Sequence, residues 1–146
     1  MSLPETSSTI LSPDYRPSEK EKFMNPVMQE YFRQKLLRWR QELLEESRET
    51  ISGLQEDNLQ KPDIADRASA ETDHALELRT RDRERKLISK INGALEKIND
   101  DSYGYCEETG EPIGIARLEA RPIATLSLEA QERHERLERT QRDNRE

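Results

Sequence analysis

Apolar residues recur at helical spacing over residues 27–54, mostly three, four or seven positions apart. They are Val27, Tyr31, Leu36, Leu37, Trp39, Leu43, Leu44, Ile51 and Leu54. Charged residues fill the positions between them, so we expect one helix with an apolar stripe along one side. Asn25 suits an N-cap and Pro26 suits the first turn, while Pro62 predicts that the helix ends near Asp57–Asn58.

A second helical pattern begins after Pro62 and continues to about Asn99. Its far half carries an apolar heptad seam of Ile88, Ile91, Leu95 and Ile98. Its near half is poorer, and the candidate seam residues there are Ala65, Ala68, Ala75 and Leu78. Because only about five residues join the two helices, they must run antiparallel. The pattern predicts a coiled-coil hairpin over residues 25–100 with its tip at 58–68.

The segments outside the hairpin differ from it in composition. Residues 1–24 are rich in Ser, Thr and Pro, which predicts an arm and part of a globular base. Residues 101–126 mix apolar residues with glycine and proline, which predicts a small turn-rich knob. Residues 127–146 carry Glu-to-Arg pairs four positions apart, which predicts an exposed final helix. The expected fold class is therefore mainly α.

Composition favours long, solvated helices over one large core. Charged residues make up 38% of the 146 positions and hydrophobic residues only 32%, against about 45–50% apolar in a typical domain. The net charge of −7 and the interleaving of both signs argue against specific DNA binding. One cysteine excludes an internal disulfide. Residues 1–10 lack the pattern of a signal peptide and no segment reads as a membrane span, so we expect a cytoplasmic protein.

Two acidic residues in the expected turn, Asp63 and Asp66, allow two interpretations. In the first, Asp63 caps the second helix and Asp66 offsets its dipole, for about 0.3–1 kcal/mol. In the second, the long stalk delivers both carboxylates to a metal ion or to basic groups in a deep cavity. The two interpretations are compatible. We see no nucleophile–base set, phosphate loop or metal cluster, so we do not expect an enzyme.

Several stretches resemble the DksA family of bacterial transcription factors over about residues 23–127. These are Phe23-Met24-Asn25, Trp39-Arg40, Asp63-x-x-Asp66-Arg67-Ala68, residues 76–88, Gly104-Tyr105-Cys106, Ile113-Gly114-Ile115 and residues 117–122. The resemblance implies a monomer that binds RNA polymerase at the secondary channel and the β′ subunit, without specific DNA contacts. It implies destabilised open promoter complexes, inhibition of ribosomal RNA promoters, activation of amino-acid promoters, and action with ppGpp in the stringent response.

The resemblance also assigns roles along the hairpin. Asp63, Asp66 and Ala68 match tip positions that contact the polymerase near its catalytic centre. Arg83 matches a stalk position that holds the polymerase rim. It belongs to a basic belt of Arg79, Arg81, Arg83, Arg85 and Lys86. Without the resemblance, this belt is interpreted as a solvated helix face paired with its own acids.

A third set of matching positions concerns ppGpp. Leu87, Lys90 and Arg121 match the family's ppGpp site at the junction of stalk and knob. A further basic position of that site, early in the final helix, is Gln131 here. This departure bears on the strength of ppGpp binding, because a cationic side chain is missing.

The family's knob holds zinc with four cysteines spaced C-x2-C-x17-C-x2-C. The four positions read Cys106, Thr109, Ser127 and Ala130 in this chain. Because structural zinc takes four Cys or His ligands, we expect a degenerate zinc-finger-like knob that holds no zinc. Packing of its aromatic and aliphatic residues would replace the metal. Cys106 is either a buried, inert side chain or a redox-sensing thiol.

Two other functions are compatible with such a hairpin. A transcript-cleavage or elongation factor of the Gre type would use tip carboxylates to hold a Mg²⁺ ion. A plain coiled-coil adaptor would have no role at the polymerase. An assay of transcript cleavage in backtracked complexes distinguishes the first function from that of the DksA family. A pull-down that contains no polymerase subunits would favour the second.

Overall fold

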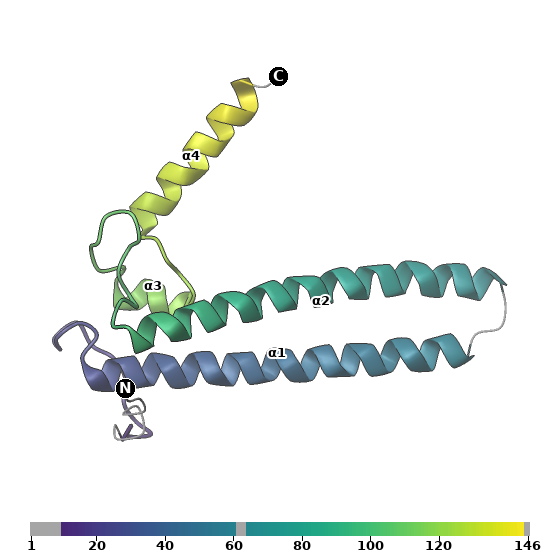
Figure 1. The fold of residues 1–146 in the computed structure, drawn as a ribbon, viewed down its shortest axis with the longest axis horizontal. Coiled ribbons are helices and arrows are strands. Elements are labelled where there is room, and N and C mark those ends of the chain that lie inside the picture. The colour runs from purple at the N-terminus through teal and green to yellow at the C-terminus, as the bar shows by residue number, and fades with distance from the viewer. Residues whose placement is uncertain (1–9, 61–63, 145–146) are drawn as a thin grey trace. The chain divides into compact units, whose positions relative to one another are not determined.

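The computed structural model describes the backbone of residues 10–60 and 64–144, and the side chains of residues 10–49 and 68–142. The described backbone contains four helices, namely α1 (Pro26–Gln60), α2 (Ile64–Asn99), α3 (Ile115–Ala120) and α4 (Leu128–Asn144) (Figure 1). The fold is mainly α, with a long helical hairpin, a small turn-rich knob and a C-terminal helix. The predicted fold class is confirmed.

The chain divides into two compact units. One comprises Met1–Leu36 with Ala94–Glu146, and the other comprises Leu37–Gly93. Within the second unit α1 and α2 run antiparallel. Two hydrogen bonds between them show this, because the later residue of α1 bonds to the earlier residue of α2. Arg40 donates to Asn92 at 2.7 Å, and Ser47 donates to Glu84 at 3.2 Å. These two bonds give the register of the stalk.

Local chemistry explains where the long helices begin and end. The side-chain oxygen of Asn25 accepts the backbone N–H of Met28 at 2.9 Å, which is an N-cap bond at the start of α1. The end of α1 at Gln60 lies a few residues beyond the predicted end. After α2, the N–H of Ser102 donates to the carbonyl of Lys97 at 2.9 Å, and Asp101 adopts a φ of 63°. This is a Schellman motif built without glycine.

Inward positions of α2 follow one another at alternating spacings of four and three residues. All are buried or half-buried, and they are Ala70, His74, Glu77, Arg81, Glu84, Ile88, Ile91, Leu95 and Ile98. The apolar seam predicted for the far half is therefore confirmed. The seam predicted for the near half is wrong, because Ala68, Ala75 and Leu78 are exposed and polar side chains occupy the inward positions. Ala65 lies outside the described side chains.

The core of the first unit lies where the helical base meets the knob. Met28, Phe32 and Leu36 of α1 are fully buried, as is Leu118 of α3. The ring of Phe32 lies 5.7 Å from that of Tyr103. Fully burying each of these large side chains contributes about 1.5–3 kcal/mol to the stability of this unit.

The knob contains a helix that the sequence did not predict. α3 spans six residues, and Gly114 and Pro122 lie close to its two ends. Such a short helix has no room for an amphipathic period. Elsewhere the knob is built from turns, with an isolated antiparallel bridge between Tyr105 and Pro112. In the described part of the chain, no helix is both long and apolar enough to cross a membrane.

Candidate functional site

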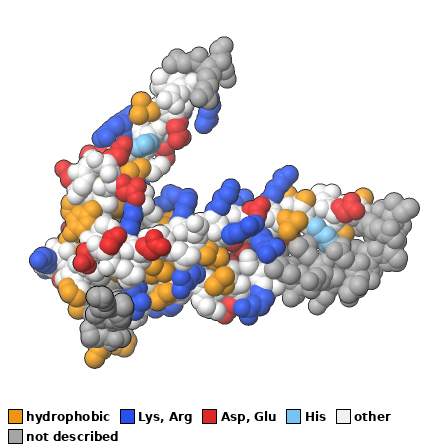
Figure 2. All heavy atoms as spheres, viewed as in Figure 1, with side chains coloured by type: hydrophobic (Ala, Val, Ile, Leu, Met, Phe, Trp, Pro, Cys, Tyr) orange, Lys and Arg blue, Asp and Glu red, His pale blue; other side chains and the backbone are white. Residues whose placement is uncertain are grey.

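The outer face of α2 carries a row of cations. Arg79, Arg83, Lys86 and Lys90 are spaced four, three and four residues apart, so they share one face of the helix. All four are exposed, and Figure 2 shows Lys and Arg side chains gathered along this helix. We call these four residues the basic stripe. An exposed row of like charge can bind an acidic surface of another macromolecule.

The basic belt expected from the sequence divides into three environments. Only Arg79, Arg83 and Lys86 of that belt lie in the basic stripe. Arg81 is half-buried at an inward position, and Arg85 forms an ion pair with Asp82 one turn earlier. Sequence reasoning grouped these residues because they are adjacent along the chain, whereas the helical period separates them.

The tip residues are described only in part. Ala68 is exposed on α2. The backbone of Asp66 lies in the first turn of α2, where the helix dipole favours a negative charge. Its side chain lies outside the described residues, as does Asp63 altogether. The expectation that both carboxylates act at the tip stays a prediction.

The residues expected at the ppGpp site lie in both compact units. Leu87 is half-buried and Lys90 is exposed, and both belong to the unit of residues 37–93. Arg121 is exposed at the C-terminal end of α3, where its N–H donates to the carbonyl of Arg117 at 2.7 Å. Gln131 is half-buried near the start of α4 and donates to Glu135 at 3.3 Å. Their joint role stays a prediction.

Cys106 lies in the knob and is buried, with 3% of its surface exposed. Burial by itself raises the pKa of this thiol, but hydrogen bonds from the Ser127 backbone, the Thr109 side chain and backbone, and the Glu108 backbone outweigh it. Together they lower the pKa to about 6. Cys106 is buried, as the first of its two interpretations requires, but its environment favours the thiolate and not an inert thiol.

The other three positions of the four-cysteine pattern carry structural contacts. Thr109 accepts the backbone N–H of Glu111 at 3.2 Å. The Ser127 hydroxyl accepts the N–H of Ala130 at 3.2 Å, which makes it the N-cap of α4. Ala130 is fully buried, so its methyl group packs inside the knob. Sequence reasoning treated Ser127 only as a lost ligand, although a serine directly before a helix is a known capping signal.

A charged cluster joins the knob to α4. Glu108 contacts the ring nitrogen of His134 at 2.7 Å and the guanidinium of Arg133 at 3.5 Å. All three side chains are partly exposed, so this cluster contributes modestly to stability.

Two known families match successive parts of the chain. The family described as "DnaK suppressor protein DksA, N-terminal domain" matches residues 28–98, which include most of α1 and α2. The family described as "Prokaryotic dksA/traR C4-type zinc finger" matches residues 101–136, which include the knob and the first half of α4.

The expectation that the chain holds no zinc is contradicted by the second match, because that family is a four-cysteine zinc finger. The family thus implies zinc at Cys106, Thr109, Ser127 and Ala130. The donor atoms present do not fit a four-thiolate site, since these residues offer one thiol, two hydroxyls and a methyl group. Among the described residues, no three His, Cys, Asp or Glu side chains gather as a metal cluster would require.

Similar whole proteins extend the match over nearly the full length. The RNA polymerase-binding transcription factor DksA of Caulobacter vibrioides is 70% identical over 131 residues, which are 90% of this chain and 92% of that protein. Its namesake from Escherichia coli K12 is 45% identical and covers 79% of this chain and 76% of its own length. The solved structure of transcription factor DksA2 from Pseudomonas aeruginosa is 45% identical, covers 80% of this chain and 90% of its own, and has a TM-score of 0.75. The chain therefore belongs to the DksA family.

Proposed function

We propose that this chain is a cytoplasmic, non-catalytic transcription regulator that binds bacterial RNA polymerase as a monomer through the secondary channel and the β′ subunit. The observation that carries the proposal is the 70% identity, over 90% of the chain, to a protein named for RNA polymerase binding. The hairpin supports it, because two packed helices are slender enough to enter a channel that excludes a globular domain.

At the tip, Asp63, Asp66 and Ala68 act near the catalytic centre of the polymerase and destabilise open promoter complexes. Two observations support this role. The exposed methyl group of Ala68 lets another surface approach the helix closely. The helical backbone at Asp66 places an acidic residue in the first turn of α2.

Along the stalk, Arg83 holds the rim of the channel as part of the basic stripe. An arginine presents five N–H donors in a planar fork that matches a carboxylate. The exposure of Arg83, and its place in a row of four cations, support this contact. Because the four charges share one helix face, they meet a partner surface together.

The regulator acts with ppGpp in the stringent response, inhibiting ribosomal RNA promoters and activating amino-acid promoters. Leu87, Lys90 and Arg121 bind ppGpp together with the polymerase. The exposed cationic groups of Lys90 and Arg121 support this role, since phosphate oxygens form strong charge-assisted hydrogen bonds with such groups.

The test is the lifetime of open complexes on a ribosomal RNA promoter, with and without ppGpp. We expect the purified chain to shorten that lifetime, and Asp66→Asn to remove the effect because it removes one tip charge. Asp73→Asn is the matched control, since Asp73 is an exposed residue further along the same helix. An Asp66→Asn protein that still shortens the lifetime argues against the tip mechanism.

Cleavage of backtracked transcripts separates this function from that of a Gre-type factor. In an elongation complex stalled in the backtracked state, the chain is expected to leave the rate of RNA cleavage at its intrinsic value. Cleavage that is stimulated by the chain, and lost in Asp66→Asn, would favour the cleavage factor instead.

A further inference from the structure

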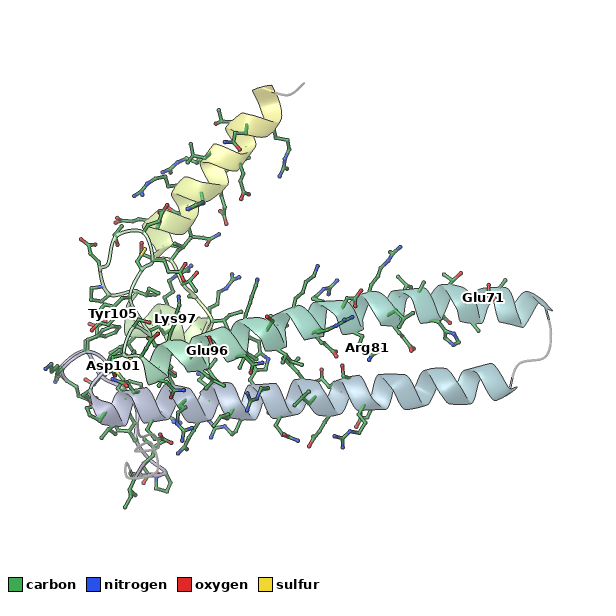
Figure 3. The ribbon with its side chains drawn as sticks, in the orientation of Figure 1. Glu71, Arg81, Glu96, Lys97, Asp101 and Tyr105 are labelled. Atoms are coloured by element: carbon green, nitrogen blue, oxygen red, sulfur yellow. The ribbon has the colours of Figure 1, made fainter. Side chains whose placement is uncertain are left out.

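The side chains on the inward face of α2 change from apolar to ionisable between Ile88 and Glu84. Ile88 and Ile91 continue the apolar seam of the base. The next four inward positions toward the tip carry ionisable side chains, and they are Glu84, Arg81, Glu77 and His74. Figure 3 shows Arg81 extending from α2 on the side of α1. The outer half of this seam therefore contains polar groups where a coiled coil ordinarily has apolar ones.

Glu84 is the most buried member of this polar run, with 8% of its surface exposed. Its Oε2 accepts a hydrogen bond from Ser47 of α1 at 3.2 Å. Ser47 lies one turn beyond Leu43, which is the last buried apolar side chain on the described part of α1. The Ser47–Glu84 hydrogen bond thus joins the two helices just beyond their apolar seam.

A buried polar pair constrains the register of two helices more than an apolar contact does. Apolar side chains pack against many neighbours at similar cost, so a seam made of them tolerates sliding. A buried carboxylate without its hydrogen bond carries a desolvation penalty, so any register that separates it from its partner is disfavoured. One polar residue in a coiled-coil seam can fix register in this way.

We propose that Glu84 is a positioning residue, which acts through its hydrogen bond to Ser47 to fix the register of the outer half of the stalk. The register decides how the end of α1 at Gln60 and the start of α2 at Ile64 are offset along the stalk axis. A slip of one helical turn would change that offset by about 5 Å. The inference rests on the proposed function in one respect, namely that the reach of the tip matters at the polymerase.

Three substitutions separate positioning from simple stability. Glu84→Gln keeps an acceptor for Ser47 and is expected to preserve the register. Glu84→Leu fills the same space with an apolar side chain, so it is expected to fold with an equal or higher thermal midpoint while losing the constraint. Ser47→Ala removes the same hydrogen bond from the other helix. Asp73→Leu is the matched control, because it adds a leucine at an exposed position of α2.

The register is measured on the free protein by electron–electron spin distances. Nitroxide labels are attached to keto side chains introduced at Glu45 and Glu71, both exposed, so that Cys106 keeps its thiol. We expect one narrow distance distribution for the unsubstituted stalk, Glu84→Gln and Asp73→Leu. For Glu84→Leu and Ser47→Ala we expect a broadened or shifted distribution. An unchanged distribution in both of these variants overturns the proposal.

Open-complex lifetimes of the same proteins provide the functional readout. We expect the concentration of Glu84→Leu needed for half its effect to rise about tenfold, which corresponds to about 1.4 kcal/mol, while Glu84→Gln stays near the parent protein. Full activity of a well-folded Glu84→Leu would overturn the link between register and activity. Failure of the parent protein to shorten lifetimes would instead refute the proposed function, and the spin distances would still decide the register.

Discussion

The Tyr31 hydroxyl donates a hydrogen bond to Oε1 of Glu119 at 2.7 Å, and the ammonium group of Lys35 lies 3.0 Å from the same oxygen. Tyr31 and Lys35 belong to α1, whereas Glu119 belongs to α3. The ring of Tyr15 also packs edge-on against that of Tyr31, with 5.8 Å between ring centroids. One carboxylate thus ties the base of α1 to the knob, and the N-terminal arm packs beside the same tyrosine.

This contact predicts an acid-sensitive contribution to stability. Burial raises the pKa of Glu119, but the hydrogen bonds from Tyr31 and Lys35 and the charges of Lys35 and Arg16 outweigh it and lower the pKa below 4.5. A carboxyl with a lowered folded pKa adds stability above its unfolded pKa, and that stability is lost as pH falls through the folded value. We expect Glu119→Gln to lower the free energy of unfolding by about 1 kcal/mol at neutral pH.

Urea denaturation between pH 3 and pH 7 measures this effect. The difference between Glu119→Gln and the parent protein should begin to shrink near pH 4.5, where the unfolded carboxyl takes up a proton, and should be lost as the pH falls through the lowered pKa of the folded carboxyl. Glu111→Gln, at an exposed position of the knob outside any helix, is the control and should follow the parent curve. A constant difference at every pH would show that lost packing, and not the carboxylate charge, causes the destabilisation.

Asp101 offers a stabilising substitution. It holds a φ of 63° at the end of α2 and is exposed, so its side chain gains no burial there. Glycine reaches this backbone region without a steric cost. We expect Asp101→Gly to raise the free energy of unfolding by about 1 kcal/mol. Asp101→Ala, which removes the carboxylate but not the strain, should give no gain in the same denaturation experiment.

Gly104 is predicted to tolerate no side chain. Its φ is +92°, and an added Cβ would lie 3.1 Å from Met24 and 3.2 Å from Phe23. We expect Gly104→Ala to destabilise the protein by about 2–4 kcal/mol, through backbone strain together with overpacking. Gly110 shares a positive φ of +75° but faces open space, so Gly110→Ala isolates the strain. Equal thermal midpoints for the two variants would rule out the packing contribution.

The Ser127 hydroxyl gives a fourth stability prediction. Because it caps α4 through the N–H of Ala130, Ser127→Ala should lower stability by about 1 kcal/mol and increase amide exchange in the first turn of α4. Ser127→Asn, which retains a capping oxygen, is the control. Unaltered exchange of the Ala130 amide in Ser127→Ala would contradict the capping role.

The inward positions at the base of the hairpin could be predicted from the sequence, because apolar side chains repeat there at helical spacing. Ile88, Ile91, Leu95 and Ile98 repeat at heptad spacing, and the structure buries or half-buries all of them. Caps and turns are equally local, which explains why Asn25 was assigned correctly as the start of α1.

Features that depend on distant partners could not be predicted in this way. Glu84 resembles any solvent-exposed charge in the sequence, whereas in the structure its burial and its hydrogen bond from Ser47 on the opposite helix show that it faces inward. The Tyr31–Glu119 contact joins residues 88 positions apart, so no local pattern encodes it. The seam predicted for the near half of α2 was wrong for a related reason. A search for apolar periodicity misses inward positions that carry polar side chains.

Gln131 bears on how strongly ppGpp acts through this chain. It lies half-buried near the start of α4, and related proteins are expected to carry a basic residue at this position of the ppGpp site. A lysine there would add a charge-assisted hydrogen bond to a phosphate. If the proposed ppGpp site is correct, Gln131→Lys should lower the ppGpp concentration for half-maximal effect about tenfold, which corresponds to about 1.4 kcal/mol.

The measurement is a ppGpp titration of open-complex lifetime at a fixed concentration of the regulator. Thr140→Lys is the matched control, because it adds the same charge at an exposed position further along α4. Circular dichroism checks that the new lysine, which lies toward the positive end of the helix dipole, leaves α4 folded. If both lysine variants shift the ppGpp midpoint equally, the gain comes from overall charge. A shift confined to Gln131→Lys places the nucleotide beside the start of α4.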